Sequence, residues 1–373
     1  MHELPKIHER PLAVPLPSGK RCNVDSSCNP SGNRYDPVRQ PLVGSSLINA
    51  TTQSRMPGSI NIVVSCSNRK RYVPQADLQV QSLTHVPADD RLGEWISRLS
   101  RRGGTRIAAS NLYQGEHWIC VKRISTDAAV VRPVVYVSSA GYGLIQDSSR
   151  IKAYSATFSP RLSDSVVPRC VDDWRGYVRA WWAGLGEWRP PGIDGARTLL
   201  GLAREHPRTP LIVAASAPYL LAMRKDILDA AKALQSDSLL TLISVGGQGL
   251  DSELKRLMLR CDSRLQTVLG GTLASLNTRL VAWLVARKLK EFRRQSLQRA
   301  VDRLMANVRT VRRPSRRKMH DSELRAWIQQ RLSADERQTH SRLLRMLRDA
   351  GRACEQARFR SLVDDVRSGG LGA

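Results

Sequence analysis

Long apolar runs are absent from this sequence of 373 residues. No stretch approaches the roughly 18 consecutive apolar residues that a membrane-spanning helix needs. The opening MHELPKIHER also has no hydrophobic segment of the kind that a signal peptide carries. We therefore expect a cytoplasmic protein with no membrane partner.

Paired cysteines are absent as well. The seven cysteines are an odd number, are widely scattered and never form the CxxC spacing of a zinc site or a disulfide framework. We therefore expect no metal and no cofactor. Most of the cysteines are expected to be small buried apolar residues, with Cys66 as the exception.

Acidic residues are few beside the basic ones. Only 33 Asp and Glu stand against 59 Lys and Arg, a formal net charge of +26, and 41% of the residues are hydrophobic. The apolar fraction is enough for a core, and the charge indicates a polyanion as the partner. Arginine makes up most of the cations and suits bidentate contacts to phosphate and guanine. A solvated basic surface without a partner is the alternative.

The chain divides into three regions. Residues 1–57 are rich in Pro, Ser, Asn and Gly and predict a flexible N-terminal arm, which either has no role or contacts DNA. In residues 58–310, β-branched apolar runs alternate with amphipathic segments, which predicts an α/β core with a mostly parallel sheet flanked by helices. A basic breaker at 311–318 separates this core from a small, basic, all-helical C-terminal module at 319–373.

Hydrophobic periodicity predicts the individual elements. The expected strands are 60–65, 105–110, 134–139, 210–215 and 239–245. The expected helices of the core are 92–101, 176–185, 218–234 and one long helix over 273–308. In the C-terminal module, helices are expected over 321–332, 341–351 and 353–366, and they fit either a helix-turn-helix variant or a docking module.

The carboxyl ends of the strands are where an open α/β sheet binds its ligands. The first strand ends in SCSNRKRY (65–72), the third in SSAGYGLIQD (138–147) and the fourth in ASAPY (215–219). Glycines there would let the backbone approach a ligand closely. The candidate substrate-binding residues are Ser65, Ser67, Tyr72, Gly141, Gly143 and Ser216.

Cys66 is the strongest candidate for a nucleophile. It stands where a strand meets a helix, with Lys70 and Arg71 nearby, among the amide donors and cations that favour a thiolate. The alternative is a half-buried cysteine at a tight turn, beside basic residues that point into solvent.

Further candidates surround the same edge of the sheet. Asp147 follows the glycine turn, where a carboxylate either moves protons in the crevice or caps a following helix. Tyr113 and Tyr154 are candidates for holding a base, and His117 is expected to support structure rather than catalysis. The aromatic cluster at 174–188 predicts a buried helix face, with a base-stacking wall as the alternative.

The motif around Cys66 resembles the cysteine motif in the catalytic core of archaeosine synthase, a tRNA enzyme that acts on the nitrile of 7-cyano-7-deazaguanine. That motif runs Pro-Cys-Ser, two variable residues, then Lys-Pro-Tyr-Ser. The matching positions here are Cys66, Ser67, Lys70 and Tyr72, while Ser65 and Arg71 replace the two prolines. The glycine turn before Asp147 is similar to a glycine-leucine turn with an acidic residue in the same core.

The same motifs also resemble a bacterial and phage group related to the peroxide-stress DNA-binding proteins. Within it, bacterial proteins of DNA 7-deazaguanine modification clusters convert 7-cyano-7-deazaguanine in DNA to the 7-amido base. The resemblance covers roughly residues 58–300. It implies a DNA nitrile hydratase without a redox cofactor. Its implied partners are double-stranded DNA carrying the modified guanine and other proteins of such a cluster.

The chemistry implied by the resemblance starts at the Cys66 thiolate. The thiolate adds to the nitrile carbon and gives a thioimidate, Lys70 or Asp147 protonates the nitrogen, and water activated by Asp147 releases the amide. The nitrile on C7 projects into the major groove, so attack is conceivable both with and without flipping of the base.

Basic residues are concentrated toward the end of the chain. Residues 287–373 hold 23 Lys and Arg against 10 Asp and Glu, about half of the whole excess. The candidate DNA-binding residues are Arg71, Arg287, Lys288, Arg293, Arg294, Arg312, Arg313, Arg316, Arg317 and Lys318. Two other functions remain open: a non-catalytic DNA-binding protein of stress or defence type, and a glycosylase-like base-processing enzyme.

Overall fold

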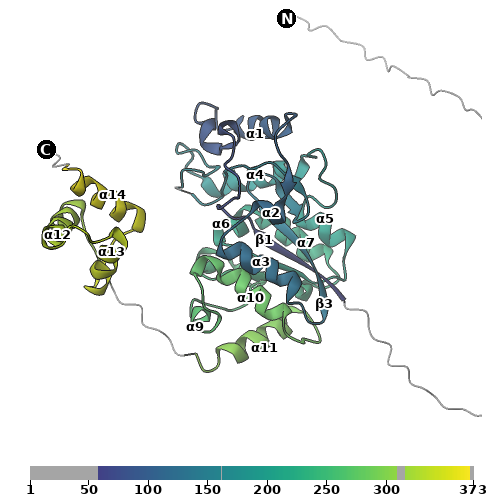
Figure 1. Cartoon of the computed structure of the whole chain (residues 1–373). Coiled ribbons are helices and arrows are strands. Elements are labelled where there is room, and N and C mark those ends of the chain that lie inside the picture. Colours follow the sequence, from purple (N-terminus) through teal and green to yellow (C-terminus); the bar gives the residue numbers. More distant parts are fainter. Residues whose placement is uncertain (1–57, 161, 309–315, 370–373) are drawn as a thin grey trace, which may run out of the picture. The chain divides into compact units, whose positions relative to one another are not determined.

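The computed structural model describes residues 58–160, 162–308 and 316–369 (Figure 1). Its main feature is a sheet of order β4-β3-β1-β6-β7, parallel except for β4 at one edge. The strands of this sheet are β1 (Gly58–Ser65), β3 (Val131–Ser139), β4 (Gly143–Gln146), β6 (Leu211–Ala214) and β7 (Leu240–Ile243). The predicted fold class, α/β with a mostly parallel sheet flanked by helices, is confirmed.

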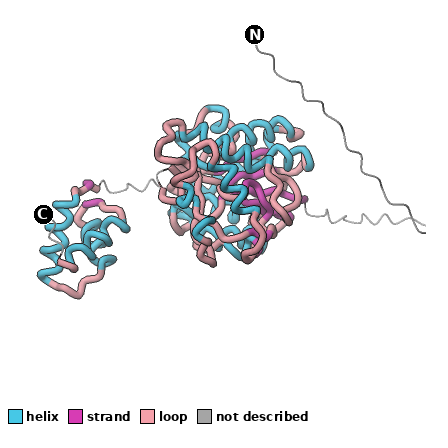
Figure 2. The backbone as a smooth tube through the Cα atoms, turned by 90° about the horizontal axis from the view of Figure 1, so that it is seen from above, coloured by secondary structure: helices cyan, strands magenta, loops and turns pink. Residues whose placement is uncertain are grey.

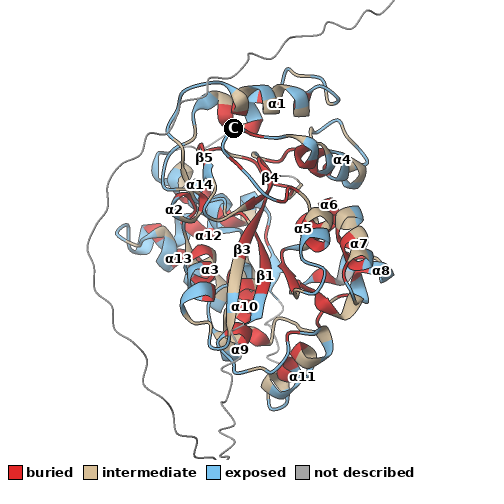
Figure 3. Cartoon of the chain, turned by 90° about the vertical axis from the view of Figure 1, so that its right-hand side faces the viewer, coloured by how far each residue is buried: buried red, intermediate tan, exposed pale blue. Residues whose placement is uncertain are grey.

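Helices cover both faces of the sheet. The α-helices of the core are α1 (Arg91–Ser100), α2 (Ala109–Leu112), α3 (Glu116–Thr126), α4 (Trp174–Glu187), α5 (Leu199–Glu205), α6 (Ala217–Ala222), α7 (Arg224–Ala233), α8 (Ser252–Lys255), α9 (Leu265–Leu269), α10 (Leu276–Val285) and α11 (Arg294–Met305). Short 3₁₀ helices lie at Ala76–Leu78, Val80–Leu83, Asp237–Leu239, Gly247–Gly249 and Leu273–Ser275. Figure 3 shows α3 and α10 on one side of β1 and β3, and α5, α6 and α7 on the other.

The central position of β1 follows from its sequence. Ile60, Ile62, Val63 and Val64 are fully buried, because β1 pairs with β3 on one side and β6 on the other and is covered on both faces. A strand covered on both faces needs a near-continuous apolar run rather than an alternating one. In Figure 2 the strands lie enclosed by helices and loops. The buried tryptophans of α4, with 2% and 3% of their surfaces exposed at Trp181 and Trp182, confirm the predicted core face there.

The order of the strands creates a switch point between β1 and β6. The chain passes from β1 to β3 on one side of the sheet, whereas it passes from β6 to β7 on the other side. Loops that leave the carboxyl ends of two such neighbours diverge and open a crevice between them. Cys66 directly follows β1, and Tyr219 lies in α6 directly after β6.

Three predicted elements of the core are wrong. Residues 105–110 contribute only β2 (Ile107–Ala108), which pairs with β5 (Arg150–Ile151) in a separate two-stranded sheet, and α2 begins directly after it. The long helix predicted over 273–308 is interrupted between α10 and α11, where Phe292 turns into the core. Similarly, the buried Met223 separates α6 from α7 within the predicted helix 218–234. Apolar periodicity alone does not reveal such interruptions.

The C-terminal module has its own hydrophobic core. Its helices are α12 (Asp321–Ala334), α13 (His340–Asp349) and α14 (Gln356–Arg367). The two-residue strand β8 (Arg317–Lys318) precedes α12 and pairs in parallel with β9 (Arg352–Ala353), which lies between α13 and α14. Leu324, Leu343 and Phe359 belong to a buried cluster separate from that of the α/β core. Gly351, with φ +71°, follows α13 and its C-cap residue Ala350, in the left-handed conformation that glycine readily adopts at a helix end. The N-terminal arm lies outside the described residues.

No helix in the described ranges is both long and apolar enough to cross a membrane.

Candidate active site

Cys66 lies at the switch point with its thiol against a tyrosine. Its backbone N–H donates to Ser138 O at 3.1 Å, which fixes Cys66 beside the end of β3. The Cys66 Sγ lies 3.2 Å from Tyr219 Oη, which in turn lies 3.4 Å from Thr157 Oγ1. Only 8% of the Cys66 surface is exposed. The thiol is therefore held in a polar but mostly closed environment.

Lys70 lies against two further tyrosines. Its Nζ donates to Ser67 O at 3.0 Å and lies 4.5 Å from the ring centroid of Tyr154 and 5.8 Å from that of Tyr113. The hydroxyl oxygens of Tyr113 and Tyr154 are 2.8 Å apart. An ammonium over aromatic faces is stabilised by the ring quadrupoles, which compensates in part for the water it has lost.

Burial sets the protonation of these groups. It lowers the pKa of Lys70, while the charges of Cys66 and Asp164 oppose that change. It raises the pKa of three tyrosines well above the ordinary value, and a charge on Cys66 acts in the same direction. These tyrosines are Tyr113, Tyr154 and Tyr219. Their hydroxyls therefore stay protonated and can donate hydrogen bonds, and Lys70 gives up its proton more readily than an exposed lysine.

His117 supports the end of β1. Its Nε2 lies 2.9 Å from Ser65 O, and its Nδ1 lies 3.4 Å from Thr278 Oγ1. Burial lowers the pKa of His117, so the neutral ring donates from Nε2 to the carbonyl. The contact ties α3 and α10 to the residue that precedes Cys66.

Asp147 lies away from Cys66. Because β4 runs antiparallel to β3, the Asp147 N–H donates to Val135 O at 3.1 Å, and Val135 pairs with Ile62 of β1. Ile62 precedes Cys66 by four residues, roughly 13 Å along a strand that rises about 3.3 Å per residue. The predicted catalytic role of Asp147 is therefore wrong. The alternative of a helix cap is also wrong, because β5 follows Asp147.

The glycines of the β3–β4 turn face the protein rather than a ligand. A Cβ added to Gly141 would lie 2.6 Å from the ring of Tyr154, and one added to Gly143 would lie 3.1 Å from Leu185 Cβ. Gly143 also has φ +72°, which the reversal into β4 requires. The groups that closely approach the backbone at these glycines are Tyr154 and α4, rather than the ligand that we predicted there.

The remaining predicted substrate-binding residues lie around the rim. Ser65 and Ser67 flank Cys66 and are half-buried, and the Ser67 hydroxyl donates to Gln114 O at 2.8 Å. Ser216 is exposed at the start of α6. Tyr72 is 50% exposed and stands in solvent beyond the cluster of buried tyrosines.

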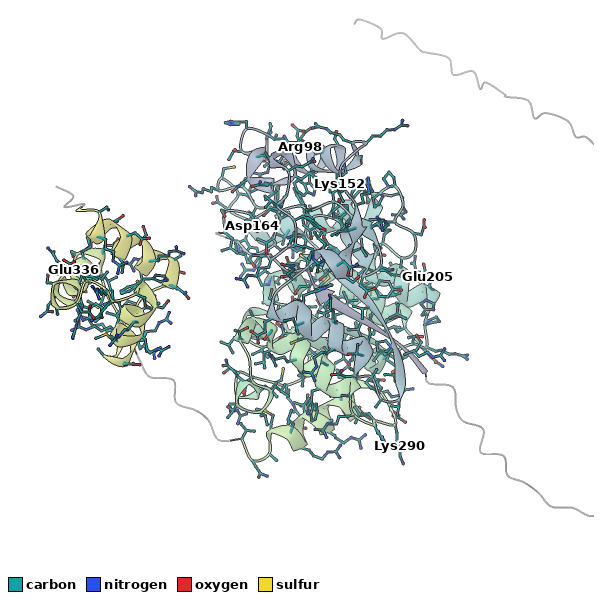
Figure 4. All side chains as sticks on the ribbon, viewed as in Figure 1. Arg98, Lys152, Asp164, Glu205, Lys290 and Glu336 are labelled. Atoms are coloured by element: carbon teal, nitrogen blue, oxygen red, sulfur yellow. The ribbon has the colours of Figure 1, made fainter. Side chains whose placement is uncertain are left out.

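Three groups near Cys66 were missed in the sequence. Ser139 Oγ lies 2.7 Å from Tyr154 Oη and accepts from Tyr142 N at 2.9 Å. Asp164, labelled in Figure 4, lies in a loop where its carbonyl accepts from Thr157 N at 2.8 Å, and its charge acts on Lys70. The third group, Tyr219, was detectable from its position just after β6. Asp164 carries no such local signal.

Some of the predicted DNA-binding residues form hydrogen bonds or ion pairs within the protein, and others are exposed to solvent. Arg294 is engaged, because its Nη1 donates to Asp237 O and Leu240 O and its guanidinium pairs with the Asp237 carboxylate. Arg317 is exposed but pairs with Glu323. The other exposed residues are Arg71, Arg287, Lys288, Arg293, Arg316 and Lys318, whereas Arg312 and Arg313 lie outside the described residues.

Helix α13 carries basic residues that were not singled out in the sequence. Arg342, Arg345 and Arg348 recur every third residue. Arg342 and Arg345 are exposed and Arg348 is half-buried, while Leu343, Leu344 and Leu347 are buried in the module. Within residues 316–369 none of these three arginines forms an ion pair. The arginines of the module that do form ion pairs are Arg317, Arg325, Arg358 and Arg360.

Cysteines and other metal-ligating residues do not gather into a metal site in the described part of the chain. Three of its five cysteines, Cys66, Cys120 and Cys354, are buried, and all five are free thiols.

Comparison of the chain with family models, curated proteins and solved structures finds no match. Its function is therefore inferred from the site itself and from the motif around Cys66.

Proposed function

We propose that this protein is a DNA-modifying nitrile hydratase that converts 7-cyano-7-deazaguanine in double-stranded DNA to the 7-amido base. The observation that supports it most is the position of the Cys66 thiol, at the switch point of the sheet beside Tyr219 and near the half-buried Lys70. Cys66 and Lys70 are also two of the four positions at which the motif resembles that of archaeosine synthase. We place the reaction in the cytoplasm, where thiols stay reduced.

The first step forms a carbon–sulfur bond. The Cys66 thiolate adds to the electrophilic nitrile carbon, and a π electron pair moves onto the nitrogen. Lys70, whose pKa is lowered by burial, gives that nitrogen a proton, and a thioimidate results. A nitrile is narrow and linear, which suits a thiol that is only 8% exposed.

The second step adds water. Asp164 replaces Asp147 in our proposal as the carboxylate. Its backbone is hydrogen-bonded to Thr157, whose hydroxyl contacts the Tyr219 hydroxyl beside Cys66, and its charge acts on Lys70. It accepts one proton of the attacking water and passes it to the nitrogen. The neutral Lys70 amine takes the proton of the new hydroxyl as the carbon–sulfur bond breaks. The amide product is released, and the Cys66 thiolate and the Lys70 ammonium are restored. The net change is the addition of one water without electron transfer.

Duplex DNA is the proposed carrier of the base. The net charge of +26 favours binding to a polyphosphate, and the exposed Arg342 and Arg345 of α13 add a surface on which phosphates can be neutralised. Other proteins of a DNA-modification cluster are the proposed further partners, because the nitrile base has to be placed in DNA first.

Nucleoside mass spectrometry tests this proposal. The protein is incubated with a duplex oligonucleotide that contains 7-cyano-7-deazaguanine, and the DNA is then digested to nucleosides. We expect the modified nucleoside to gain the mass of one water, with the gain lost in Cys66→Ala and retained in Cys261→Ala, a matched control outside the site. Unchanged DNA that is nevertheless bound would indicate a non-catalytic DNA-binding protein, and free base would indicate a glycosylase.

A further inference from the structure

A large cavity of about 1200 Å³ lies beside the loop that carries Asp164. Its polar lining consists of basic, hydroxyl and amide side chains, and none of the described residues that line it is acidic. These polar residues include Gln81, Thr84, Arg91, Ser163, Ser165 and Arg169. Such a lining is suited to an anion.

Arg91 is a buried charged residue in the lining of this cavity. It is only 5% exposed, its Nη2 donates to Val80 O at 3.3 Å, and its Nε has no hydrogen-bond partner among the described residues. A guanidinium keeps its charge in a protein, and a buried charge without a counterion is costly. The groups that oppose the effect of burial on the pKa of Arg91 are Tyr177 and Cys170 rather than a carboxylate. The missing counterion is therefore to be sought in a ligand.

One short segment connects the cavity with the Cys66 cluster. Ser165 lines the cavity and forms an isolated bridge with Thr157, and Val166 N donates to Thr157 O at 3.0 Å. Thr157 Oγ1 in turn lies 3.4 Å from the Tyr219 hydroxyl that contacts Cys66. A ligand in the cavity thus lies across this segment from the nucleophile.

We propose that the cavity binds a phosphate group of a nucleotide, with Arg91 as the buried anchor and the exposed Arg169 as the second cation. The apolar part of the lining, with Leu162 and Trp174, accepts the sugar or base. The phosphate belongs either to the backbone of a DNA strand or to a free nucleotide. This binding does not depend on nitrile hydration.

Isothermal titration calorimetry on the whole chain tests the site. The probes are inorganic phosphate, deoxyguanosine 5′-monophosphate, deoxyguanosine and a single-stranded trinucleotide without terminal phosphates. We expect the phosphate-bearing probes to bind and deoxyguanosine to bind at least about ten-fold more weakly than its monophosphate. Tighter binding of the trinucleotide assigns the site to a DNA strand, and tighter binding of the monophosphate assigns it to a free nucleotide. Equal binding of nucleoside and monophosphate overturns the proposal.

Variants identify the cavity as the place of binding. Arg91→Met removes the buried positive charge. Arg169→Gln removes a positive charge at an exposed position, where the substitution does not threaten folding. We expect each to weaken binding of the monophosphate roughly ten-fold, whereas Arg179→Gln, at an exposed arginine of α4 outside the lining, leaves it unchanged. Equal effects of Arg169→Gln and Arg179→Gln contradict the proposal. Cys66→Ala should abolish hydration and keep phosphate binding, so the two proposals can fail separately.

Discussion

At Lys70, the same burial that lowers the pKa also gives the ammonium its proposed role. The protonated form supplies the proton that the nitrile nitrogen needs, and the lowered pKa brings that transfer closer to neutral pH. Tyr113 and Tyr154 keep their protons over the same range, so they hold Lys70 without competing for the role of acid.

The pH dependence of hydration tests this role. Activity requires protonated Lys70, so the rate should fall as the pH rises through a pKa below 10.5, the ordinary value for lysine. In Lys70→Arg the guanidinium does not titrate, so this alkaline fall should disappear, with the rate lowered by roughly 10²–10⁴ because arginine is a poor proton donor. An alkaline fall that is the same in both proteins would mean that another group titrates.

Several residues of the site could be found from the sequence because they lie next to predicted strands. Cys66 and Lys70 follow β1, and the structure places Tyr113 and Tyr154 over Lys70. Asp147 was misassigned because the sequence does not show that the chain reverses at Gly143. Asp164 was missed because it reaches the cluster through tertiary structure, from a loop with no strand before it.

Among the elements, the fully buried strands were the easiest to predict. Apolar runs such as Ile60–Val64 fit little else than a central parallel strand. The run at 105–110 holds only one large aliphatic residue, Ile107, and it becomes β2 and α2 instead of a strand of the main sheet. The break between α10 and α11 depends on the burial of Phe292, which periodicity does not report.

The arginine face of α13 can be tested by the salt dependence of DNA binding. Each phosphate contact that is lost should lower the slope of log K against log salt concentration by about 0.9. We expect the double variant Arg342→Gln/Arg345→Gln to lower the slope by about two. The control Arg325→Gln/Arg360→Gln removes two arginines that are paired with Asp365 and Asp364, and it should change the slope less. Equal changes in both would show that α13 has no special role.

The contact between α3 and the segment before α10 has its own pH signature. Glu116 pairs with Arg279 at 2.7 Å and accepts from Thr272 N and Ser275 Oγ, and these contacts lower its pKa to about 2. Because the carboxyl pKa of Glu116 is lower in the folded than in the unfolded protein, the ionised carboxylate stabilises the fold at a pH above its unfolded-state pKa. That stabilisation is lost as the pH falls toward 2.

Glu116→Gln should therefore destabilise the protein at pH 7 by roughly 1 kcal/mol, since the group is partly exposed. Chemical denaturation of wild type and variant between pH 7 and pH 2 measures the difference, which should shrink below the ordinary glutamate value of 4.5. A difference that is constant with pH would assign the effect to packing instead.

At the scale of the whole molecule, the described residues form two hydrophobic cores. The C-terminal module is stabilised by its own leucines around Trp327 and Phe359, whereas the proposed catalytic residues Cys66 and Lys70 lie in the α/β core. The proposed chemistry and part of the proposed DNA binding thus fall in regions that need not unfold together.

Leu343→Ala tests this independence. Leu343 is fully buried in the module, so its truncation should cost about 2–5 kcal/mol and unfold the module first. Hydrogen exchange should then increase within residues 316–369 and stay unchanged in β1, β3 and β6. Increased exchange in these strands as well would show that the two cores fold as one unit.

The central claim is that the Cys66 thiolate attacks the nitrile of a base in DNA. Acid quenching of a single turnover, followed by proteolysis and mass spectrometry, measures it most directly. We predict a transient adduct of the modified base on the Cys66 peptide, absent from Cys66→Ala, that appears before the amide. Hydration at an unchanged rate in Cys66→Ala, with no adduct on the wild-type protein, would contradict the account.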